Sequence, residues 1–216
     1  MKKKTHISQI RFNYKKSVLD IKNSDLDPFK QFNKWMNEAI KYKVYEPTAF
    51  TLATINKRNK VSNRMILLKA IKNDSFIFYT NLKSRKSYEL KTNKNVAAVF
   101  WWPQIGKQVR IEGNVKNISK KIADNYFSTR SRKSQISSWA SDQSSVLKDK
   151  KTLLTKFKII EKRFENSDIK RPSFWSGYEI HPFLIEFWQS RENRLHDRIV
   201  YKKIKQKKWR KYRLNP

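Results

Sequence analysis

The sequence predicts an α+β fold that is mainly antiparallel β, a single barrel-like domain to which helices are added. Segments with strand character follow one another at short spacing between polar turns, and most helical segments come late in the chain. A doubly wound sheet would instead alternate strands and helices throughout. The 216 residues, 38% of them hydrophobic, contain no internal repeat and no linker. We therefore expect one sizeable domain, residues 26–216, after a mobile basic arm, residues 1–25.

The first helix is predicted from a capping signal. Asp27 suits the N-cap position and Pro28 suits the first helical position. Apolar residues then recur at helical spacing through about Lys43, which indicates one buried face. Further helices are predicted over residues 84–92, 119–128 and 148–164.

Strands are predicted where short apolar runs, rich in β-branched and aromatic residues, lie between polar turns. These runs cover residues 49–55, 64–70, 75–80, 96–102, 107–118, 178–187, 197–204 and 208–214. Turn sequences such as Asn56 to Asn59 separate neighbouring runs, so we expect hairpin connections.

The formal net charge of +32 would ordinarily suggest a nucleic-acid partner. The lysines are spread along the whole chain beside many Asn and Ile residues, as in proteins encoded by A/T-rich genomes. Compositional bias therefore explains the charge better than a selected function, and we expect only weak, salt-sensitive adhesion to polyanions. Aromatic residues interleaved with lysines over residues 207–213 keep a non-enzymatic RNA- or DNA-binding protein open as an alternative.

The chain contains no cysteine, which excludes disulfides, thiolate nucleophiles and cysteine-bound zinc or iron–sulfur centres. The basic N-terminus has no apolar stretch behind it, so it does not resemble a secretory signal. The longest apolar run, residues 96–102, is too short to span a bilayer. We expect a soluble cytoplasmic protein with no membrane partner.

Only three glycines occur, so the chain has no glycine-rich loop that could hold a nucleotide through its backbone. Any phosphate must then be bound by side chains, and two segments supply them. Arg64 and Lys69 stand at the two ends of an apolar run, and residues 79–87 place hydroxyls and cations where a strand leads into a helix. An exposed, solvated surface explains both segments equally well.

A third candidate consists of Tyr126, Arg130 and Ser134, which lie at positions i, i+4 and i+8. On a helix they would share one face, and a phenol, a guanidinium and a hydroxyl suit a second phosphate pocket. An exposed polar helix face is an equally good interpretation of the same spacing.

Residues 186–198 gather aromatic rings, arginines and a histidine within a short span. Arg194, His196 and Arg198 alternate, so a strand would direct them to one face. The nearby Trp188 suits a flat ligand, and guanidinium groups suit an anionic one. The segment therefore predicts a site for a flat, anionic molecule.

Taken in order, these segments resemble the motifs of the pyridoxamine 5′-phosphate oxidase family, from about Arg11 to Pro216. The resemblance implies a split β-barrel homodimer with FMN at the subunit interface. The implied activity is oxidation of pyridoxamine 5′-phosphate or pyridoxine 5′-phosphate to pyridoxal 5′-phosphate, in vitamin B6 biosynthesis and salvage. Hydride would pass from substrate C4′ to flavin N5, and O2 would reoxidise the flavin with release of H2O2.

The resemblance also assigns site residues by position. The implied FMN contacts are Arg64, Met65, Ile66, Leu67, Leu68, Lys69, Tyr79, Thr80, Arg85, Lys86, Gln108, Gln143, Ser144, Trp188 and Arg198. The implied substrate contacts are Arg11, Phe12, Asn13, Tyr14, Lys69, Tyr126, Arg130, Ser134, Arg194, Leu195 and His196. Arg194 and His196 are the implied catalytic residues, which would orient and polarise the substrate.

Three positions depart from the family's pattern: Glu46 where Asp is expected, Ser131 where proline is common, and Ser190-Arg191 in a turn that is often glycine-rich. None removes an implied phosphate ligand, so we expect activity, at a reduced rate. A flavin reductase or haem-handling protein of the same barrel superfamily is the remaining alternative. The second phosphate pocket and the Arg194–His196 pair argue against it, because such relatives need no pyridoxal phosphate site.

Overall fold

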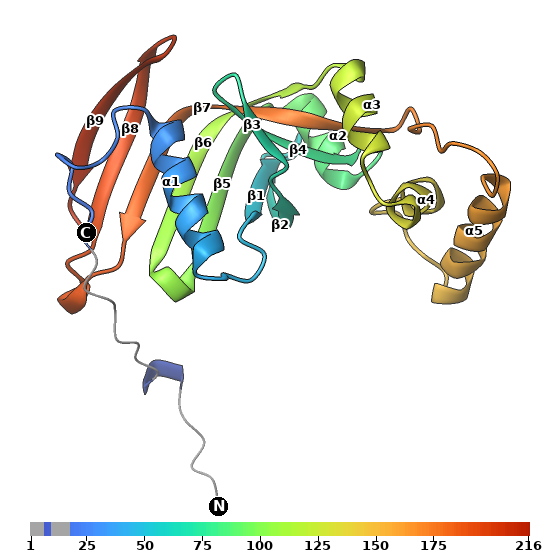
Figure 1. Ribbon diagram of the computed structural model, residues 1–216, viewed down its shortest axis with the longest axis horizontal. Helices are drawn as coiled ribbons and strands as arrows, with labels where there is room; N and C mark the ends of the chain where they lie inside the picture. Colours follow the sequence, from blue (N-terminus) through green and yellow to red (C-terminus); the bar gives the residue numbers. More distant parts are fainter. Residues whose placement is uncertain (1–6, 10–17) are drawn as a thin grey trace, which may run out of the picture. The chain divides into compact units, whose positions relative to one another are not determined.

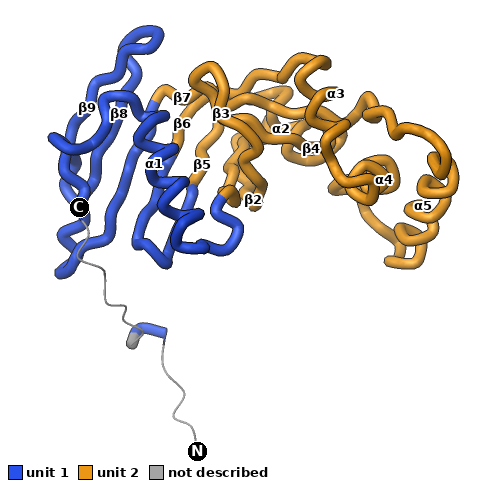
Figure 2. Tube along the Cα trace, in the orientation of Figure 1, with its two compact units in different colours: residues 1–47, 100–110, 184–216 blue, residues 48–99, 111–183 orange. Residues whose placement is uncertain are grey.

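The computed structural model describes residues 7–9 and 18–216 of the chain (Figure 1). The chain forms two compact units, each assembled from separate stretches of sequence (Figure 2). The first unit comprises the described residues up to 47 together with residues 100–110 and 184–216, and the second comprises residues 48–99 and 111–183. Three strands continue from one unit into the other, namely β5 (Asn95–Trp102), β6 (Lys107–Asn117) and β7 (Trp175–Gln189).

Helix α1 (Pro28–Lys41) in the first unit begins at the predicted cap, because the Asp27 carboxylate accepts a 2.8 Å hydrogen bond from the Phe29 amide. The apolar face of α1 is buried and packs on aromatic side chains of the strands. The Phe32 ring lies 5.0 Å from that of Phe100, and the Trp35 ring lies 5.1 Å from that of Phe187. Such edge-to-face aromatic packing fixes the helix against this end of the sheet.

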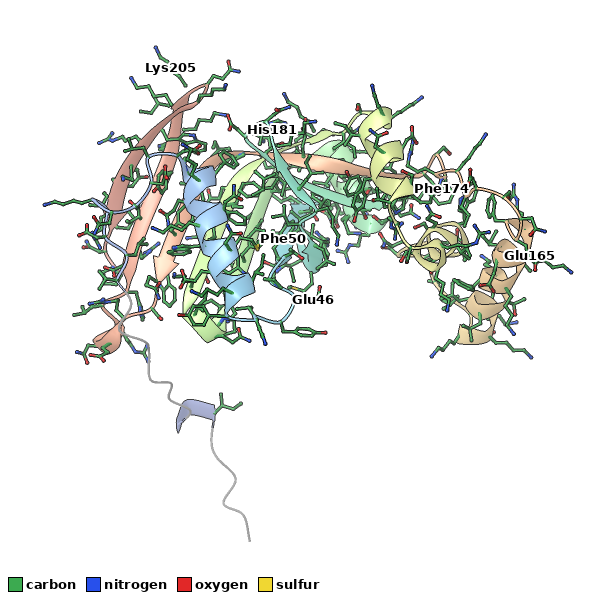
Figure 3. All side chains as sticks on the ribbon, in the orientation of Figure 1. Glu46, Phe50, Glu165, Phe174, His181 and Lys205 are labelled. Atoms are coloured by element: carbon green, nitrogen blue, oxygen red, sulfur yellow. The ribbon has the colours of Figure 1, made fainter. Side chains whose placement is uncertain are left out.

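Strands β8 (Asp197–Lys205) and β9 (Lys208–Leu214) form an antiparallel hairpin in the same unit, and β8 also pairs with the last part of β7. Figure 3 places the Lys205 side chain at the turn of this hairpin. The Tyr201 hydroxyl is fully buried and donates a 2.6 Å hydrogen bond to the Asp25 carbonyl, which ties the segment before α1 to β8. Three short 3₁₀ helices, η1 (Ile7–Gln9), η2 (Pro103–Ile105) and η3 (Glu192–Arg194), complete the described part of the unit.

The sheet of the second unit is built from the strands that come first in the sequence. These are β1 (Ala49–Ile55), β2 (Val61–Leu67), β3 (Ala70–Lys72) and β4 (Ser75–Asn81), followed by helix α2 (Arg85–Thr92). The β1–β2, β1–β5, β3–β4 and β4–β7 pairings are all antiparallel. Phe50, Phe78 and Tyr178 are buried between these strands, with the Phe78 ring 5.6 Å from the Tyr178 ring.

The hydrogen-bonded strand order is β2-β1-β5-β6-β7-β4-β3, with β8 pairing off β7 and β9 pairing off β8. This arrangement confirms the predicted antiparallel α+β class, because no helix crosses between parallel neighbours in the pairings given above. None of the helices in the described residues is long and apolar enough to span a membrane.

Three helices close the second unit: α3 (Lys120–Ser128), α4 (Arg132–Ala140) and α5 (Lys150–Arg163), coloured from yellow-green to orange in Figure 1. Phe127, Ile136, Ile169 and Trp175 form their buried cluster, with partly buried rings around it. The Arg132 guanidinium donates hydrogen bonds to main-chain carbonyls that follow α5, at Phe164, Glu165 and Ser167. Helix α5 contributes no fully buried residue.

The predicted elements largely match the observed ones, except that helix α4 was not predicted and three further expectations are corrected. The run predicted as one strand over residues 64–70 is divided, since β2 ends at Leu67 and β3 begins at Ala70. Tyr126, Arg130 and Ser134 do not share one helix, because the chain leaves α3 at Ser128 and starts α4 at Arg132. Arg194, His196 and Arg198 do not alternate along one strand. Asn193 and Arg194 adopt positive φ angles of 54° and 61°, which turn the chain before β8 begins.

The predicted N-terminal arm, residues 1–25, falls mostly outside the described residues and stays a prediction. The implied closing segment over the substrate lies wholly outside the described residues. It consists of Arg11, Phe12, Asn13 and Tyr14.

Candidate functional site

A cavity of about 420 Å³ in the second unit gathers most of the sequence-predicted phosphate and flavin contacts. Its walls come from β2, β4, β7 and helices α2, α3 and α4. The lining residues are Arg64, Met65, Ile66, Leu67, Lys69, Tyr79, Thr80, Asn81, Lys86, Tyr126, Arg130, Ser137, Ser138, Ser141, Gln143 and Trp175. Segments that lie far apart in the sequence therefore meet at one site.

Four cationic side chains, Arg64, Lys69, Lys86 and Arg130, line this cavity, and no carboxylate is among its lining residues. Cations gathered without neutralising acids repel one another and attract anions. The cavity is therefore suited to a ligand with more than one negative charge.

The Arg64 side chain extends from β2 and is held from two sides. One terminal nitrogen donates to the Leu52 carbonyl at 2.9 Å and to the Thr54 hydroxyl at 2.5 Å. The other donates to the Ser62 hydroxyl at 2.5 Å and to the Glu89 carboxylate at 3.2 Å. Burial lowers the pKa of Arg64, and the charge of Glu89 opposes that shift.

Glu89 on α2 is the acid at the centre of this network, and its side chain is only 5% exposed. Thr54 and Ser62 donate hydroxyl hydrogen bonds to one carboxylate oxygen at 2.5 and 2.7 Å, and Arg85 Nε donates to the other at 2.9 Å. Burial alone raises the pKa of Glu89, but these hydrogen bonds and the charge of Arg64 lower it to about 2. The carboxylate therefore stays ionised at neutral pH.

Lys86 on α2 is a buried ammonium group whose hydrogen-bond partners are all neutral. Its Nζ donates to Thr80 Oγ1 at 3.0 Å, to Ser84 Oγ at 3.2 Å and to Gln143 Oε1 at 2.8 Å. Burial, and then the charge of Arg64, lower the pKa of Lys86 to about 8, although Glu89 opposes the shift. An anion bound here would restore the environment that an ammonium group favours.

Three aromatic rings stack along one wall of the cavity. The Tyr79 ring lies 4.0 Å from the Tyr126 ring and 5.3 Å from the Trp175 ring, at interplanar angles of 13° and 6°. The Arg130 guanidinium lies 4.7 Å from the Trp175 ring centroid, and it donates to Ser138 Oγ at 2.5 Å. Burial raises the pKa of both tyrosines, so their phenols remain protonated donors at neutral pH.

A second cavity, of about 670 Å³, shares Asn81 and Gln143 with the first. The predicted FMN contacts Arg85 and Ser144 line this neighbouring cavity. Ser144 adopts a positive φ of 72°, which turns the chain just after Gln143. Leu68, also a predicted contact, is 7% exposed and lines neither cavity.

Trp188, Arg194, His196 and the other predicted residues near the C-terminus belong to the first unit. The His196 ring lies 4.6 Å from the Trp188 ring, and His196 Nδ1 accepts a 3.0 Å hydrogen bond from the Arg191 amide. That bond leaves the proton of the neutral imidazole on Nε2. Burial, and then the charge of Arg194, lower the pKa of His196, which favours this neutral form.

Arg198, predicted to contact FMN, forms an ion pair with the buried Glu186, with Nε 2.8 Å from Oε1. Arg194 and Leu195 are exposed in the turn before β8, and Gln108 lies on β6, partly exposed. Only Arg198 of the three alternating residues lies in a strand.

The sequence analysis missed a row of serines on and just after α4. Ser137, Ser138 and Ser141 line the cavity, whereas the predicted Ser134 does not and its hydroxyl instead bonds that of Ser131 at 2.8 Å. The spacing of the row, i, i+3, i+4 and i+7 from Ser134, was visible in the sequence as one face of a helix. Trp175 was also missed, since it belongs to no charged motif, and Asn81 was not singled out within residues 79–87.

The model of the family described as pyridoxamine 5′-phosphate oxidase matches residues 36–164, more than half of the chain. The chain belongs to this family. A second model, described as the pyridoxine 5′-phosphate oxidase C-terminal dimerisation region, matches residues 175–216. The predicted family and oxidoreductase class are confirmed by these matches and by relatives along the whole chain.

Curated relatives of the family align over nearly the full length of the chain. A protein of Leptospira interrogans named pyridoxine/pyridoxamine 5′-phosphate oxidase is 45% identical over 210 residues, covering 97% of this chain and 98% of its own. A protein of the same name from Aliarcobacter butzleri is 43% identical and covers 97% of this chain and 99% of its own.

Among solved structures, PhzG from Burkholderia lata, in complex with tetrahydrophenazine-1-carboxylic acid, superposes with a TM-score of 0.86 at 28% identity. The match covers 92% of this chain and 98% of PhzG. A pyridoxamine 5′-phosphate oxidase-related, FMN-binding protein from Nostoc punctiforme has a TM-score of 0.71 at 16% identity, a likeness of fold alone.

Proposed function

We propose that this family member is an FMN-dependent oxidase that converts pyridoxamine 5′-phosphate or pyridoxine 5′-phosphate to pyridoxal 5′-phosphate. The observation that carries the proposal is the cavity of the second unit. Four cations and a stacked aromatic wall line it, and no carboxylate is among its lining residues. Such a cavity suits flat molecules that carry phosphate groups.

The residues at the α2 side of the cavity fit the phosphate of FMN. Lys86 is a buried donor with only neutral partners, and Arg64, Thr80 and Gln143 lie around it. Charge-assisted hydrogen bonds of this kind contribute roughly 1.5–3 kcal/mol each, so a few side chains replace a glycine-rich loop. Bound FMN would supply the hydride acceptor, and O2 would regenerate it with release of H2O2.

Lys69, Tyr126 and Arg130 are the proposed ligands of the substrate phosphate. Tyr126 presents a protonated phenol, and Arg130 is fixed by Ser138 and by the Trp175 ring. Because these groups would bind a second phosphate, they favour a phosphorylated vitamer over its unphosphorylated form. Ser134 and the residues from Arg11 to Tyr14 stay proposed substrate contacts without structural support.

Arg194 and His196 are the proposed residues that orient the substrate. The lowered pKa favours the neutral His196 ring, and a neutral imidazole suits polarising a substrate oxygen or nitrogen. Both residues lie within the matched dimerisation region, residues 175–216. We therefore propose a homodimer in which the same segment serves assembly and catalysis, with FMN at the subunit interface. We also propose that the protein is cytoplasmic.

The first test is an absorption spectrum of the purified protein after reconstitution with FMN, followed by anaerobic addition of pyridoxine 5′-phosphate. We expect flavin bands that bleach on addition and return when O2 is admitted. Pyridoxine without the phosphate is the matched control, and it should bleach the bands only at much higher concentration.

Two outcomes would contradict the proposal. Flavin bands that do not respond to either phosphorylated vitamer would indicate another flavoprotein of this fold. Failure to retain any flavin after reconstitution would exclude the flavin-dependent function altogether. Tight nucleic-acid binding at physiological salt would then favour the basic, non-enzymatic alternative.

A further inference from the structure

We propose that Glu89 is a positioning residue for the FMN phosphate: it holds Arg64 and Arg85 in the arrangement that binds the anion. The inference rests on the proposed function, because it assigns the phosphate to the cavity side that Arg64 and Lys86 line. It adds a residue that would decide how strongly the cofactor binds through the cations that it orients.

The contacts of Glu89 support a positioning role because each carboxylate oxygen has its own set of donors. One oxygen accepts from the two hydroxyls of Thr54 and Ser62, which face each other across the β1–β2 pair, and from Arg64. The other accepts from Arg85, one helical turn before Glu89. The carboxylate thereby links α2 to β1 and β2 at the place where the cations gather.

Arg64 depends on this network for its orientation. The Ser62 hydroxyl both accepts from Arg64 and donates to Glu89, so the guanidinium and the carboxylate are joined directly and through one shared hydroxyl. A guanidinium binds oxyanions through a planar fork of donors, so its usefulness depends on the angle at which it is held. Without Glu89, the side chain would keep only its contacts on β1 and β2.

The charges at this site also suit the proposal. Arg64, Arg85 and Lys86 carry three positive charges, and Glu89 carries the single negative charge of the network. The net positive charge that remains balances the roughly −1.5 to −2 charge of a phosphate monoester at neutral pH. Glu89 therefore limits repulsion among the cations in the empty site while leaving enough positive charge for the ligand.

A purely electrostatic role of Glu89 and a positioning role predict opposite changes in FMN affinity when Glu89 is neutralised. If Glu89 only added negative charge near the phosphate, Glu89→Gln would remove a repulsion and tighten FMN binding. If Glu89 positions the cations, the same variant weakens FMN binding despite the added net positive charge. Ser62→Ala separates the two further, because it removes a shared hydroxyl and leaves the net charge unchanged.

The experiment is a fluorescence titration of FMN and of riboflavin, which lacks the phosphate, into apoprotein of the wild type and each variant. We expect Glu89→Gln to raise the Kd of FMN at least tenfold and Ser62→Ala to raise it about threefold, while the Kd of riboflavin changes less than twofold. Riboflavin binding shows that each variant is folded. Glu165→Gln, which neutralises an exposed acid of the same unit, is the matched control and should leave both Kd values unchanged.

The outcomes separate this inference from the proposed function. Unchanged or tighter FMN binding in Glu89→Gln would overturn the positioning role and leave the oxidase proposal standing. An equal loss of FMN and riboflavin would also overturn it, since that pattern marks a general structural role. A wild type that binds FMN no better than riboflavin would refute the phosphate site itself, and both proposals with it.

Discussion

The affinity for FMN should fall as the pH rises above 8, because of Lys86. In the ligand-free protein, burial and the charge of Arg64 lower the pKa of Lys86 to about 8. A phosphate dianion next to the ammonium favours its charged form, so bound FMN raises this pKa again. Lys86 must therefore take up a proton whenever FMN binds above pH 8, and binding weakens as that proton becomes scarcer.

The size of the loss in FMN affinity follows from how far bound FMN raises the pKa of Lys86. Affinity falls up to tenfold for each pH unit above the ligand-free pKa, until the pKa of the complex is reached. Between pH 7 and pH 9.5 we expect a loss of roughly 30-fold in FMN affinity. The second ionisation of a phosphate monoester lies near pH 6, so the ligand is a dianion over the whole range.

The assay is the ratio of FMN affinity to riboflavin affinity, measured by fluorescence titration at half-unit steps of pH. The ratio removes effects that act on the flavin ring or on the protein as a whole, since the two ligands differ only in the phosphate. Lys86→Arg is the control, because a guanidinium stays charged throughout and should flatten the profile. A wild-type ratio that is constant from pH 7 to pH 9.5 would refute the reasoning.

Three further predictions concern single substitutions. Arg130→Ala should raise the KM for pyridoxine 5′-phosphate roughly 10- to 100-fold, because it removes one charge-assisted hydrogen bond, while FMN content stays the same. Steady-state kinetics of the reconstituted enzyme measure this, and an unchanged KM would count against the substrate-phosphate assignment. Arg194→Ala should depress turnover much more than FMN content, and an equal loss of both would argue against an orienting role.

Gly106→Ala should reduce the free energy of unfolding by at least about 1–2 kcal/mol, the cost of a left-handed conformation for a residue with a side chain. Gly106 has a φ of 61°, and an added Cβ would lie 2.1 Å from the hydroxyl oxygen of buried Ser190. Urea denaturation measures the loss, and Ser190→Ala in the same background should recover part of it. A variant as stable as the wild type would show that the Gly106 turn can relax.

The parts of the fold that local signals determine could be predicted from the sequence. Asp27 and Pro28 are a local capping signal, and the observed helix begins there. The break between β2 and β3 was missed because Leu68 continues the apolar run, whereas pairing with β1 ends at Leu67 and pairing with β4 begins at Ala70. Pairing partners lie elsewhere in the chain, so the residues of the run do not show where one strand ends and the next begins.

The sequence predicted the charged residues of the candidate site and several neutral ones, but it missed the serines of α4, Trp175 and the indirectly acting Glu89. Arg64, Lys86 and Arg130 stand out in a sequence because cations beside apolar runs suit phosphate. The structure adds that Arg64 and Lys86 are held by partners on other elements, among them Gln143 and Glu89. In a chain with 50 lysines and arginines, an acid such as Glu89 gives no sequence signal of its own.

The high basic charge and the binding site are separate properties of this chain. On the β8–β9 hairpin, Lys202 stands opposite Arg210 and Lys205 opposite Lys208, although like charges in facing positions destabilise a sheet. Those cations are exposed, so water and salt screen them and their repulsion costs little. Lys86 is buried, and there the loss of hydration, together with the charge of Arg64, lowers its pKa to about 8. Burial is what turns one cation among 50 into a group whose charge depends on the ligand.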